Sequence, residues 1–366
     1  MAVFRTAKTD DMPYLRTLWQ QCFGDSDAFC DWFFSERWLP ELSTVAEEGG
    51  QILSAVHGWP YTLRIRNNAI PSIIMCGVAT HPAARGKGLM GGCLSLFMQS
   101  ARAQGFLALF QKPVDFEIYR RYLHFPAADA AILTAKNEAV FTPVKNMLDS
   151  LCSDVFAEEL LSIYQKNTAG YSACVIRSIE DMGLKLRDYA ADGGRLLRYA
   201  PNGYTAAYAA YYITDDQLLV PEIMGNDAHA ALLMEHLAAM AQGRKLIIKT
   251  FRGPVPDGFT AKISPWGAMA ALNAPALMRE VCGFDDISAE ITDPIIPENN
   301  GIFTFSGAVA PSAHIKLDAG RLTQLLVGYR DILSLIKSGY AEVLSPEALL
   351  LGERLPALSC FTVEEY

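Results

Sequence analysis

The sequence lacks the cysteine and histidine spacings that mark disulfide-rich domains and zinc sites. Its 366 residues include eight cysteines and six histidines, but no two cysteines form a Cys-x-x-Cys pair and most have apolar neighbours. Cysteines scattered in this way are typical of small buried side chains in a reducing compartment. We therefore predict no metal site and a cytoplasmic protein.

Long apolar runs are also missing. A membrane helix needs about 18 uninterrupted apolar residues, and the sequence has no such stretch. Its first residues, MAVFRTAKTDD, do not have the apolar core of a signal peptide. This pattern predicts that the membrane is not a partner, and it again favours a cytoplasmic location.

The chain has no excess of basic residues. Its 31 Lys and Arg stand against 40 Asp and Glu, for a formal net charge of -9. A general nucleic-acid binder needs a basic face that releases counterions, so we exclude nucleic acid as a partner, and a cationic substrate suits this charge better. With 51% hydrophobic and 19% charged residues, the chain is typical of a well-packed globular protein. Its length predicts two or three domains.

The stretch up to Thr80 predicts two helices followed by an antiparallel meander. A helix begins at Thr9–Pro13, and a second, rich in aromatic residues, covers Asp25–Trp38. Those aromatic side chains form either core or the wall of a pocket, and burial statistics favour core. Four strands are predicted over 43–47, 51–57, 61–65 and 72–80, with Gly-Gly and Asn-Asn turns between some of them.

Residues 78–92, VATHPAARGKGLMGG, join the last of these strands to a helix that is predicted from Met90 to Ala101, ahead of a short strand over 106–110. A helix N-terminus exposes unpaired N–H groups, and glycines let a bulky anion approach them. Arg85 and Lys87 add positive charge. The loop is therefore suited to a diphosphate.

Two common phosphate-binding patterns fit this loop poorly. A Walker A motif needs Ser or Thr after the lysine, but Gly88 follows Lys87. Residues 86–91 satisfy the spacing Gly-x-Gly-x-x-Gly, yet His81-Pro82-Ala83-Ala84 intervenes after the strand, and the next strand ends in Gln111-Lys112 without the expected acid. An ordinary glycine turn that caps a helix is the remaining simple interpretation.

Arg85-Gly86-Lys87-Gly88-Leu89-Met90, after a strand that ends in Val78-Ala79-Thr80, resembles the acetyl-coenzyme A loop of the GCN5-related N-acetyltransferases (GNAT). That resemblance implies that backbone amides of the loop hold the coenzyme's diphosphate, and that acetyl-CoA is the cosubstrate without any metal. Met90 departs from the small residue that the family has there. The implied coenzyme-binding residues are Val78, Ala79, Thr80, Arg85, Gly86, Lys87, Gly88, Leu89 and Met90.

The resemblance extends to FEIYRRYLHFP, residues 116–126. GNAT enzymes place a tyrosine here that protonates the departing thiolate, and Tyr119 occupies its place. Tyr122 stays a second candidate, because Leu123-His124-Phe125 replaces the family's Gly-Phe. A phenol with an ordinary pKa near ~10 is chemically suited to that role.

Beyond residue 140 the chain predicts a second strand, helix, strand unit and a small end segment. Gly225-Asn226-Asp227 stands where the first unit has its loop, without an arginine or a glycine cluster, so this half is not expected to bind coenzyme. The predicted helices cover 143–170, 231–240, 268–281, 319–326, 332–339 and 346–351. The predicted strands cover 174–178, 196–212, 218–224, 245–250, 286–291, 301–305 and 314–317.

This order resembles the enhanced intracellular survival (Eis) type of acetyltransferase. The resemblance implies an α+β (mixed α/β) chain with tandem GNAT folds, whose mixed and mostly antiparallel sheets are flanked by helices, plus a small sterol-carrier-protein-like α/β domain. The implied domains are 1–138, catalytic; 139–262, GNAT-like without a coenzyme loop; and 263–366, sterol-carrier-like. In that family a terminal carboxylate helps to deprotonate the amine, which assigns a catalytic role to Tyr366, beside Glu365.

The resulting prediction is an N-acetyltransferase that transfers acetyl directly to a primary amine of a small cationic molecule or peptide. The alternative is a catalytically silent acyl-CoA sensor or an apolar-ligand-binding protein. The sequence does not identify the acceptor amine or the regiospecificity, and it leaves open whether the protein forms a homo-oligomer.

Overall fold

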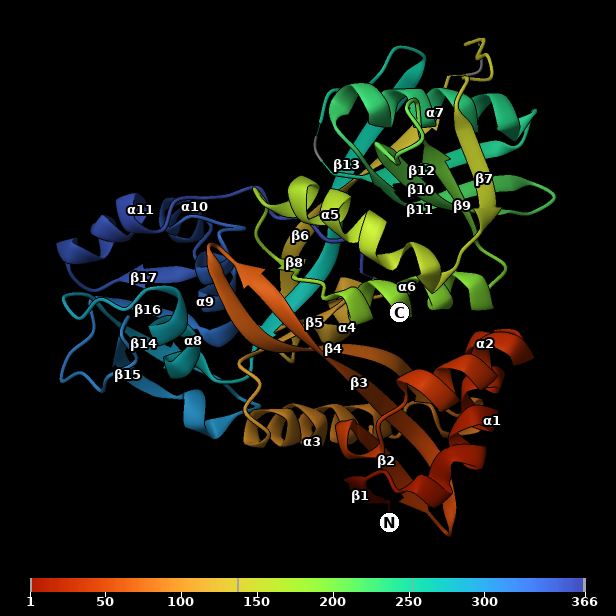
Figure 1. Cartoon of the computed structure of the whole chain (residues 1–366). Helices are drawn as coiled ribbons and strands as arrows, with labels where there is room; N and C mark the ends of the chain where they lie inside the picture. Colours follow the sequence, from red (N-terminus) through yellow and green to blue (C-terminus); the bar gives the residue numbers. More distant parts are fainter. Residues whose placement is uncertain (1, 137, 252, 365–366) are drawn as a thin grey trace.

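The computed structural model describes residues 2–136, 138–251 and 253–364 and has a mixed α/β architecture (Figure 1). A large sheet of 13 strands has the order β1-β2-β3-β4-β5-β13-β6-β12-β11-β10-β9-β7, and β8 pairs with β3. A second sheet has the order β15-β14-β16-β17. Most neighbours are antiparallel, but β4 with β5, β11 with β12 and β14 with β16 are parallel. The predicted fold class is confirmed.

The N-terminal part forms the predicted meander and its helices. The strands predicted over 51–57 and 61–65 are one strand, β3, because Pro60 lies beyond the end of β2, where its missing N–H breaks no ladder with that strand. The elements of this part are β1 (Val3–Thr6), α1 (Met12–Phe23), α2 (Asp27–Trp32), β2 (Ser43–Glu48), β3 (Gln51–Ile65), β4 (Asn68–Thr80), α3 (Leu89–Ala103), β5 (Ala108–Gln111), α4 (Phe116–Arg120) and β6 (Phe125–Ala135).

Strands β4 and β5 part after a short parallel contact, and this opens the sheet. They pair only over Ser72–Ile74, after which β4 continues to Thr80 while β5 ends at Gln111. The pairing of β3 with β4 shifts register next to Gly77, which has φ +54°. A Cβ on Gly77 would overlap the Trp19 ring, so glycine is required at this bulge.

The middle part repeats a strand, helix, strand order in β11, α7 and β12, as predicted. The helix predicted over 143–170 is wrong at Met147–Leu151, which pair with β9 at the edge of the sheet. The helix over Ile179–Ala191 was not predicted. The elements are β7 (Met147–Leu151), α5 (Ala157–Thr168), β8 (Cys174–Val175), α6 (Ile179–Ala191), β9 (Arg195–Tyr199), β10 (Ala207–Ile213), β11 (Gln217–Met224), α7 (Asp227–Ala241) and β12 (Lys245–Thr250).

The predicted helix over 268–281 is wrong in its first part. Ala268–Ala271 end a long strand, β13 (Phe259–Ala271), which lies between β5 and β6 in the middle of the large sheet. A continuous apolar run fits a buried strand as well as a buried helix, so periodicity could not separate the two. The expected domain boundary at 262/263 falls inside β13, and the division into three domains stays a prediction.

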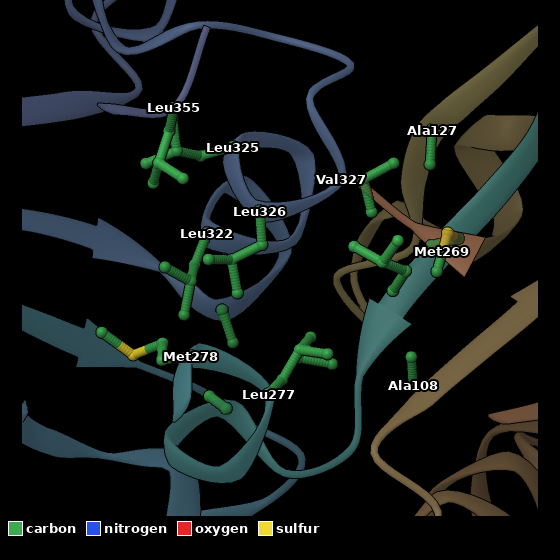
Figure 2. Packing of buried hydrophobic residues seen from close by; sticks show 14 of the residues in the cluster. Ala108, Ala127, Met269, Leu277, Met278, Leu322, Leu325, Leu326, Val327 and Leu355 are labelled. Carbon is green, nitrogen blue, oxygen red and sulfur yellow. The ribbon is translucent and has the colours of Figure 1, made fainter. Parts of the chain in front are cut away.

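The C-terminal part packs α8 and α9 between the small sheet and the large one. Leu322, Leu326 and Leu277 pack together, and the same buried cluster reaches Met269 and Ala108 of the large sheet (Figure 2). The elements are α8 (Ala274–Val281), β14 (Ser288–Thr292), β15 (Gly301–Thr304), β16 (Ile315–Asp318), α9 (Ala319–Val327), α10 (Ile332–Lys337), β17 (Ala341–Val343) and α11 (Leu351–Arg354).

None of the helices in the described part of the chain combines the length and the apolar character that crossing a membrane requires.

Candidate active site

The loop before α3 leaves the N-terminus of that helix uncovered. Gly86 and Gly88 have φ of +82° and +78°, a left-handed conformation that favours glycine. Gly88 is the capping residue, and within the described residues no side chain bonds to the first N–H groups of α3. A Cβ on either glycine would meet no described atom within 4 Å. The first turn of α3 therefore offers free N–H groups and the positive end of the helix dipole to an anion.

The other residues predicted to bind coenzyme surround this turn. Arg85 and Lys87 are exposed, and Arg85 Nε lies 3.3 Å from the carbonyl oxygen of Thr80. Thr80 Oγ1 bonds to Ser54 Oγ at 2.9 Å, and the Ala79 side chain is buried against α1 and α2. The remaining three divide between cavity and core: Val78 lines the cavity described next, Leu89 is buried, and Met90 packs on the core under α3.

A cavity of about 540 Å³ opens where β4 and β5 part. Its walls come from both strand, helix, strand units, which explains why neither unit alone predicts it. The lining residues are Met75, Cys76, Gly77 and Val78 of β4; Gln111, Lys112, Val114 and Tyr119 around β5 and α4; Trp19, Phe23, Asp25 and Phe29 near α1 and α2; and Lys185, Asp188, Tyr189, Asp192, Tyr212 and Pro221 of the middle part.

The two candidate tyrosines occupy different places. Tyr119 lines the cavity and is 6% exposed, and burial raises its pKa to about 12. Its ring stacks on His124 with centroids 5.9 Å apart. Tyr122 is buried too, but its hydroxyl contacts Gly91 of α3, and it is not a lining residue of the cavity that the described residues form. Of the two candidate tyrosines, Tyr119 is therefore the one that faces the cavity.

The aromatic residues near α1 and α2 belong to the hydrophobic core, and some of them also line the cavity. Phe33 and Phe34 are buried in the core, as predicted, while Trp19 and Phe29 belong to the same core and also face the cavity. Trp19 Nε1 donates a hydrogen bond of 2.7 Å to Asp25 Oδ2, which fixes a carboxylate at the cavity wall. This wall is suited to a cation, because it combines aromatic faces with negative charge.

Two further carboxylates at the cavity were missed by the sequence. Asp188 and Asp192 come from α6 and its C-terminal end, a helix that was not predicted. Burial raises the pKa of Asp192 to about 6, with smaller contributions from the neighbouring charges of Asp188 and Asp25. The carboxyl group of Asp192 therefore changes its charge close to neutral pH.

A buried ionic cluster ties the C-terminal segment to the cavity wall. Arg177 bonds to both carboxylate oxygens of Glu222, at 2.9 and 2.8 Å, and to Glu364 Oε1 at 2.6 Å. Lys185, a cavity residue, lies 2.9 Å from Asp188 Oδ2 and 4.0 Å from Glu364 Oε2. Burial alone would raise the pKa of Glu222, but Arg177 holds it below its ordinary value.

The predicted catalytic Tyr366, together with Glu365, lies outside the residues that the structure describes. Glu364 is the last described residue and is wholly buried. The segment that leads to it runs beside Asp129 and Ser172.

The cysteines near the cavity are poor nucleophiles. Cys76 lines the cavity and Cys93 lies in α3, and burial raises the pKa of each thiol to about 12. Both therefore stay protonated at neutral pH, which argues against a thiolate that accepts an acyl group.

Comparisons with known proteins identify two domain families, each over part of the chain, and a shared overall fold. Residues 3–122 match the acetyltransferase (GNAT) domain family, and residues 276–355 match the sterol carrier protein domain family. No curated protein shows significant sequence similarity to the chain.

Three solved structures share the fold over 100% of this chain and 100% of their own. They are a conserved protein of unknown function from Enterococcus faecalis V583 described as a probable N-acyltransferase (19% identity, TM-score 0.81), a GCN5-related N-acetyltransferase from Anabaena variabilis ATCC 29413 (14%, 0.80) and Eis1 from Mycobacterium abscessus (15%, 0.70).

Proposed function

Because the chain carries a GNAT acetyltransferase domain near its N-terminus and a sterol carrier protein domain near its C-terminus, we propose that it is an acetyl-CoA-dependent N-acetyltransferase. Its acceptor would be a primary amine of a small cationic molecule or peptide. One observation carries the proposal: the uncovered N-terminus of α3, with Gly86 and Gly88, lies at the end of the strand that lines the cavity.

The loop residues suit the diphosphate of the coenzyme. The N–H groups of the first turn of α3 would bind phosphate oxygens, and Arg85 and Lys87 would add charge from the solvent side. When bound, the coenzyme supplies an acetyl thioester, whose carbonyl carbon an amine can attack. Backbone N–H groups of the diverging end of β4, near Val78, would polarise the carbonyl oxygen.

The cavity wall suits the amine. Asp25 and Asp192 provide negative charge beside the aromatic ring of Trp19, and this combination suits a cation, whereas the charge of Asp188 is already paired with Lys185. Removal of the amine proton falls to the terminal carboxylate of Tyr366. The burial of Glu364 against Arg177 supports this assignment, because it anchors the chain two residues earlier, next to the cavity residue Lys185.

Tyr119 is the proposed proton donor to the departing thiolate. Its raised pKa keeps the phenol protonated at neutral pH, and it lines the same cavity as β4. Transfer is direct, without an acyl-enzyme, because the buried thiols of Cys76 and Cys93 stay protonated.

The test is an assay of coenzyme release from acetyl-CoA with a panel of polyamines, aminoglycosides and lysine peptides. Tyr119→Phe should lower kcat by about a hundredfold or more, the range of general acid catalysis, with little change in coenzyme affinity. Tyr122→Phe is the matched control and should stay near wild type. The opposite ranking would move the acid role to Tyr122.

Two further results test the role of the terminal carboxylate and the alternative function as a sensor. A short extension after Tyr366 should lower amine turnover and leave coenzyme binding intact; unchanged turnover would remove the terminal carboxylate from the mechanism. Binding of acetyl-CoA without turnover on any amine would favour the alternative, a sensor of acyl-CoA. The apolar-ligand version is weaker, because Leu322, Leu325 and Leu326 fill the space under the small sheet (Figure 2).

A further inference from the structure

Gln111 and His124 form a buried polar pair at the cavity that the proposed mechanism does not use. Gln111 is the last residue of β5, is 2% exposed and lines the cavity. The structure places its Nε2 atom 2.7 Å from His124 Nδ1. His124 has no exposed surface at all, and its ring stacks on Tyr119. The pair therefore connects the end of β5 with the tyrosine that faces the same space.

Leu123, the residue before His124, has an unusual backbone conformation that directs His124 into the protein. Leu123 follows α4 with φ +61°, in the left-handed region that glycine usually occupies. Such an unfavourable backbone conformation persists only where contacts with the surrounding residues hold it in place. Here the turn directs the next side chain, His124, under Tyr119 and against Gln111.

His124 is neutral, so only one of its ring nitrogens carries a proton. Burial lowers its pKa to about 3. Among the described residues, His124 Nε2 has no hydrogen-bond partner. The bond at Nδ1 allows two arrangements, because the two ends of a glutamine amide can exchange places without a change in shape.

The two arrangements differ in what they leave unpaired. If the Gln111 amide nitrogen donates to Nδ1, the ring proton sits on Nε2 and a buried donor lacks an acceptor. If Nδ1–H donates to the Gln111 carbonyl oxygen, a bare acceptor is left at Nε2 and the Gln111 N–H groups face the cavity. A donor enclosed by protein without a partner, as Nε2–H would be, is rare, whereas donors that face a cavity can pair with water or a ligand, so the second arrangement is favoured. It also leaves the Gln111 NH2 group available on the cavity side.

A neutral donor at this point suits an acyl carbonyl oxygen. Gln111 follows Phe110, whose pairing with Ile74 is the last contact before β4 and β5 part. Its amide thus stands on the β5 side of the opening, and β4 with Met75 and Val78 forms the other side. An acyl thioester bound in that opening would have the β4 backbone on one flank and Gln111 on the other.

On the basis of the proposed function, we propose that the Gln111 NH2 group donates a hydrogen bond to the acyl carbonyl oxygen of the bound coenzyme. His124 is its positioning residue, because Nδ1–H holds the amide oxygen and so fixes the direction of the NH2 group. Gln111 thereby makes the cavity prefer the acylated coenzyme over free CoA.

Calorimetric titration with acetyl-CoA and with CoA tests this assignment directly. Gln111→Met keeps the length of the side chain and removes the amide, so it should weaken acetyl-CoA binding about fivefold to tenfold, as expected for one hydrogen bond. CoA binding should change less than about twofold, because CoA has no acyl oxygen. Equal losses for both ligands, or no loss for either, would overturn the proposal.

Substitutions of His124 separate positioning from packing. His124→Phe fills the space without Nδ1 and should reproduce the selective loss of Gln111→Met. His124→Asn places an amide where Nδ1 stands and should restore the preference for acetyl-CoA. If His124→Phe keeps the preference for acetyl-CoA and His124→Asn loses it, the ring acts by packing, and this would contradict the positioning role.

The position of the ring proton on His124 can be measured in the wild-type protein, so this test depends neither on activity nor on the folding of a variant. In the wild-type protein, nitrogen NMR of His124 should show the proton on Nδ1; a proton on Nε2 would overturn the inferred direction of the amide. Failure of the proposed function looks different, since wild type would then bind neither acetyl-CoA nor CoA.

Discussion

The two strand, helix, strand units of the molecule share a frame and differ at one helix end. In the first, β4, α3 and β5, Gly88 caps the helix without a side chain. In the second, β11, α7 and β12, the Asn226 side chain accepts a hydrogen bond of 2.9 Å from the His229 N–H group. The difference lies at the cap: Gly88, in a left-handed backbone conformation, leaves the first N–H groups of α3 open, whereas Asn226, in an extended conformation, pairs one of those of α7 internally.

The space beside each parallel pair is also used differently. Where β4 leaves β5, a cavity remains. At the end of β11, Glu222 forms an ion pair with Arg177, and Met224 belongs to the same buried cluster as Phe361 of the C-terminal segment. The second unit therefore binds part of its own chain where the first has room for a ligand.

The largest expected effect is on stability, and it concerns the ion pairs that hold the C-terminal segment against the second unit. Arg177→Met would leave Glu222 and Glu364 buried without their shared counter-charge, which should lower the free energy of unfolding by about 3–5 kcal/mol. Urea denaturation measures it. Arg16→Met is the control: Arg16 pairs with the exposed Asp27 and Asp31, and its replacement should change the free energy of unfolding far less than Arg177→Met does. Equal losses would show that the Arg177 cluster is not a buried anchor.

The next effect concerns the loop cations of the first unit. Replacing both Arg85 and Lys87 by Ala should weaken binding of acetyl-CoA and of CoA roughly tenfold to a hundredfold, since each removes a charge next to the diphosphate. Lys166 lines the same surface pocket as Asn226, the capping residue of the second unit, and Lys166→Ala should have no effect on affinity. Equal weakening by both changes would break the comparison between the units.

A smaller effect should follow from exchanging the caps. Gly88→Asn gives α3 the residue that caps α7, and asparagine tolerates the left-handed backbone. Its side chain should stand in the open space beside the helix end, obstruct the close approach of the diphosphate and lower coenzyme affinity about fivefold, with the fold intact. The reciprocal Asn226→Ala should cost about 1 kcal/mol of stability and leave coenzyme binding unchanged. Coenzyme binding that is indifferent to Gly88→Asn would contradict the role of the uncovered cap.

The smallest effect is a pH dependence at the acceptor side of the cavity. Asp192 has a pKa raised to about 6, so it is neutral below that pH and charged above it. A cationic amine should therefore bind more tightly as pH rises from about 5 to 7, with KM falling severalfold, while Asp192→Asn should flatten this profile. A profile that keeps its slope in Asp192→Asn would assign the titration to another group.

Much of this arrangement could be predicted from local signals. The glycines and the cations of residues 85–88 stand between a strand and a helix, so the loop and its chemistry were visible in the sequence. Asn226 was visible too, as part of a turn without glycine cluster or arginine. These features depend on residues close together in the chain, which is why they could be placed without the fold.

The rest depends on contacts between distant segments. The strand end of β13 contains an apolar run that fits helix or strand equally, and only its position between β5 and β6 decides. Asp188 and Asp192 reach the cavity from α6, and Glu364 meets Arg177 over 187 residues of sequence. Gln111 and His124 are 13 residues apart, and nothing in their spacing predicts a hydrogen bond.

The central claim is that the N–H groups at the start of α3, with Arg85 and Lys87, bind the diphosphate of an acyl-coenzyme A. Isothermal titration of the purified protein with acetyl-CoA tests it most directly. The account predicts saturable binding at one site per chain, weakened by the loss of Arg85 and Lys87 and untouched by Lys166→Ala. Absence of binding up to about 1 mM acetyl-CoA, or binding that is equally strong after both cations are removed, would contradict it.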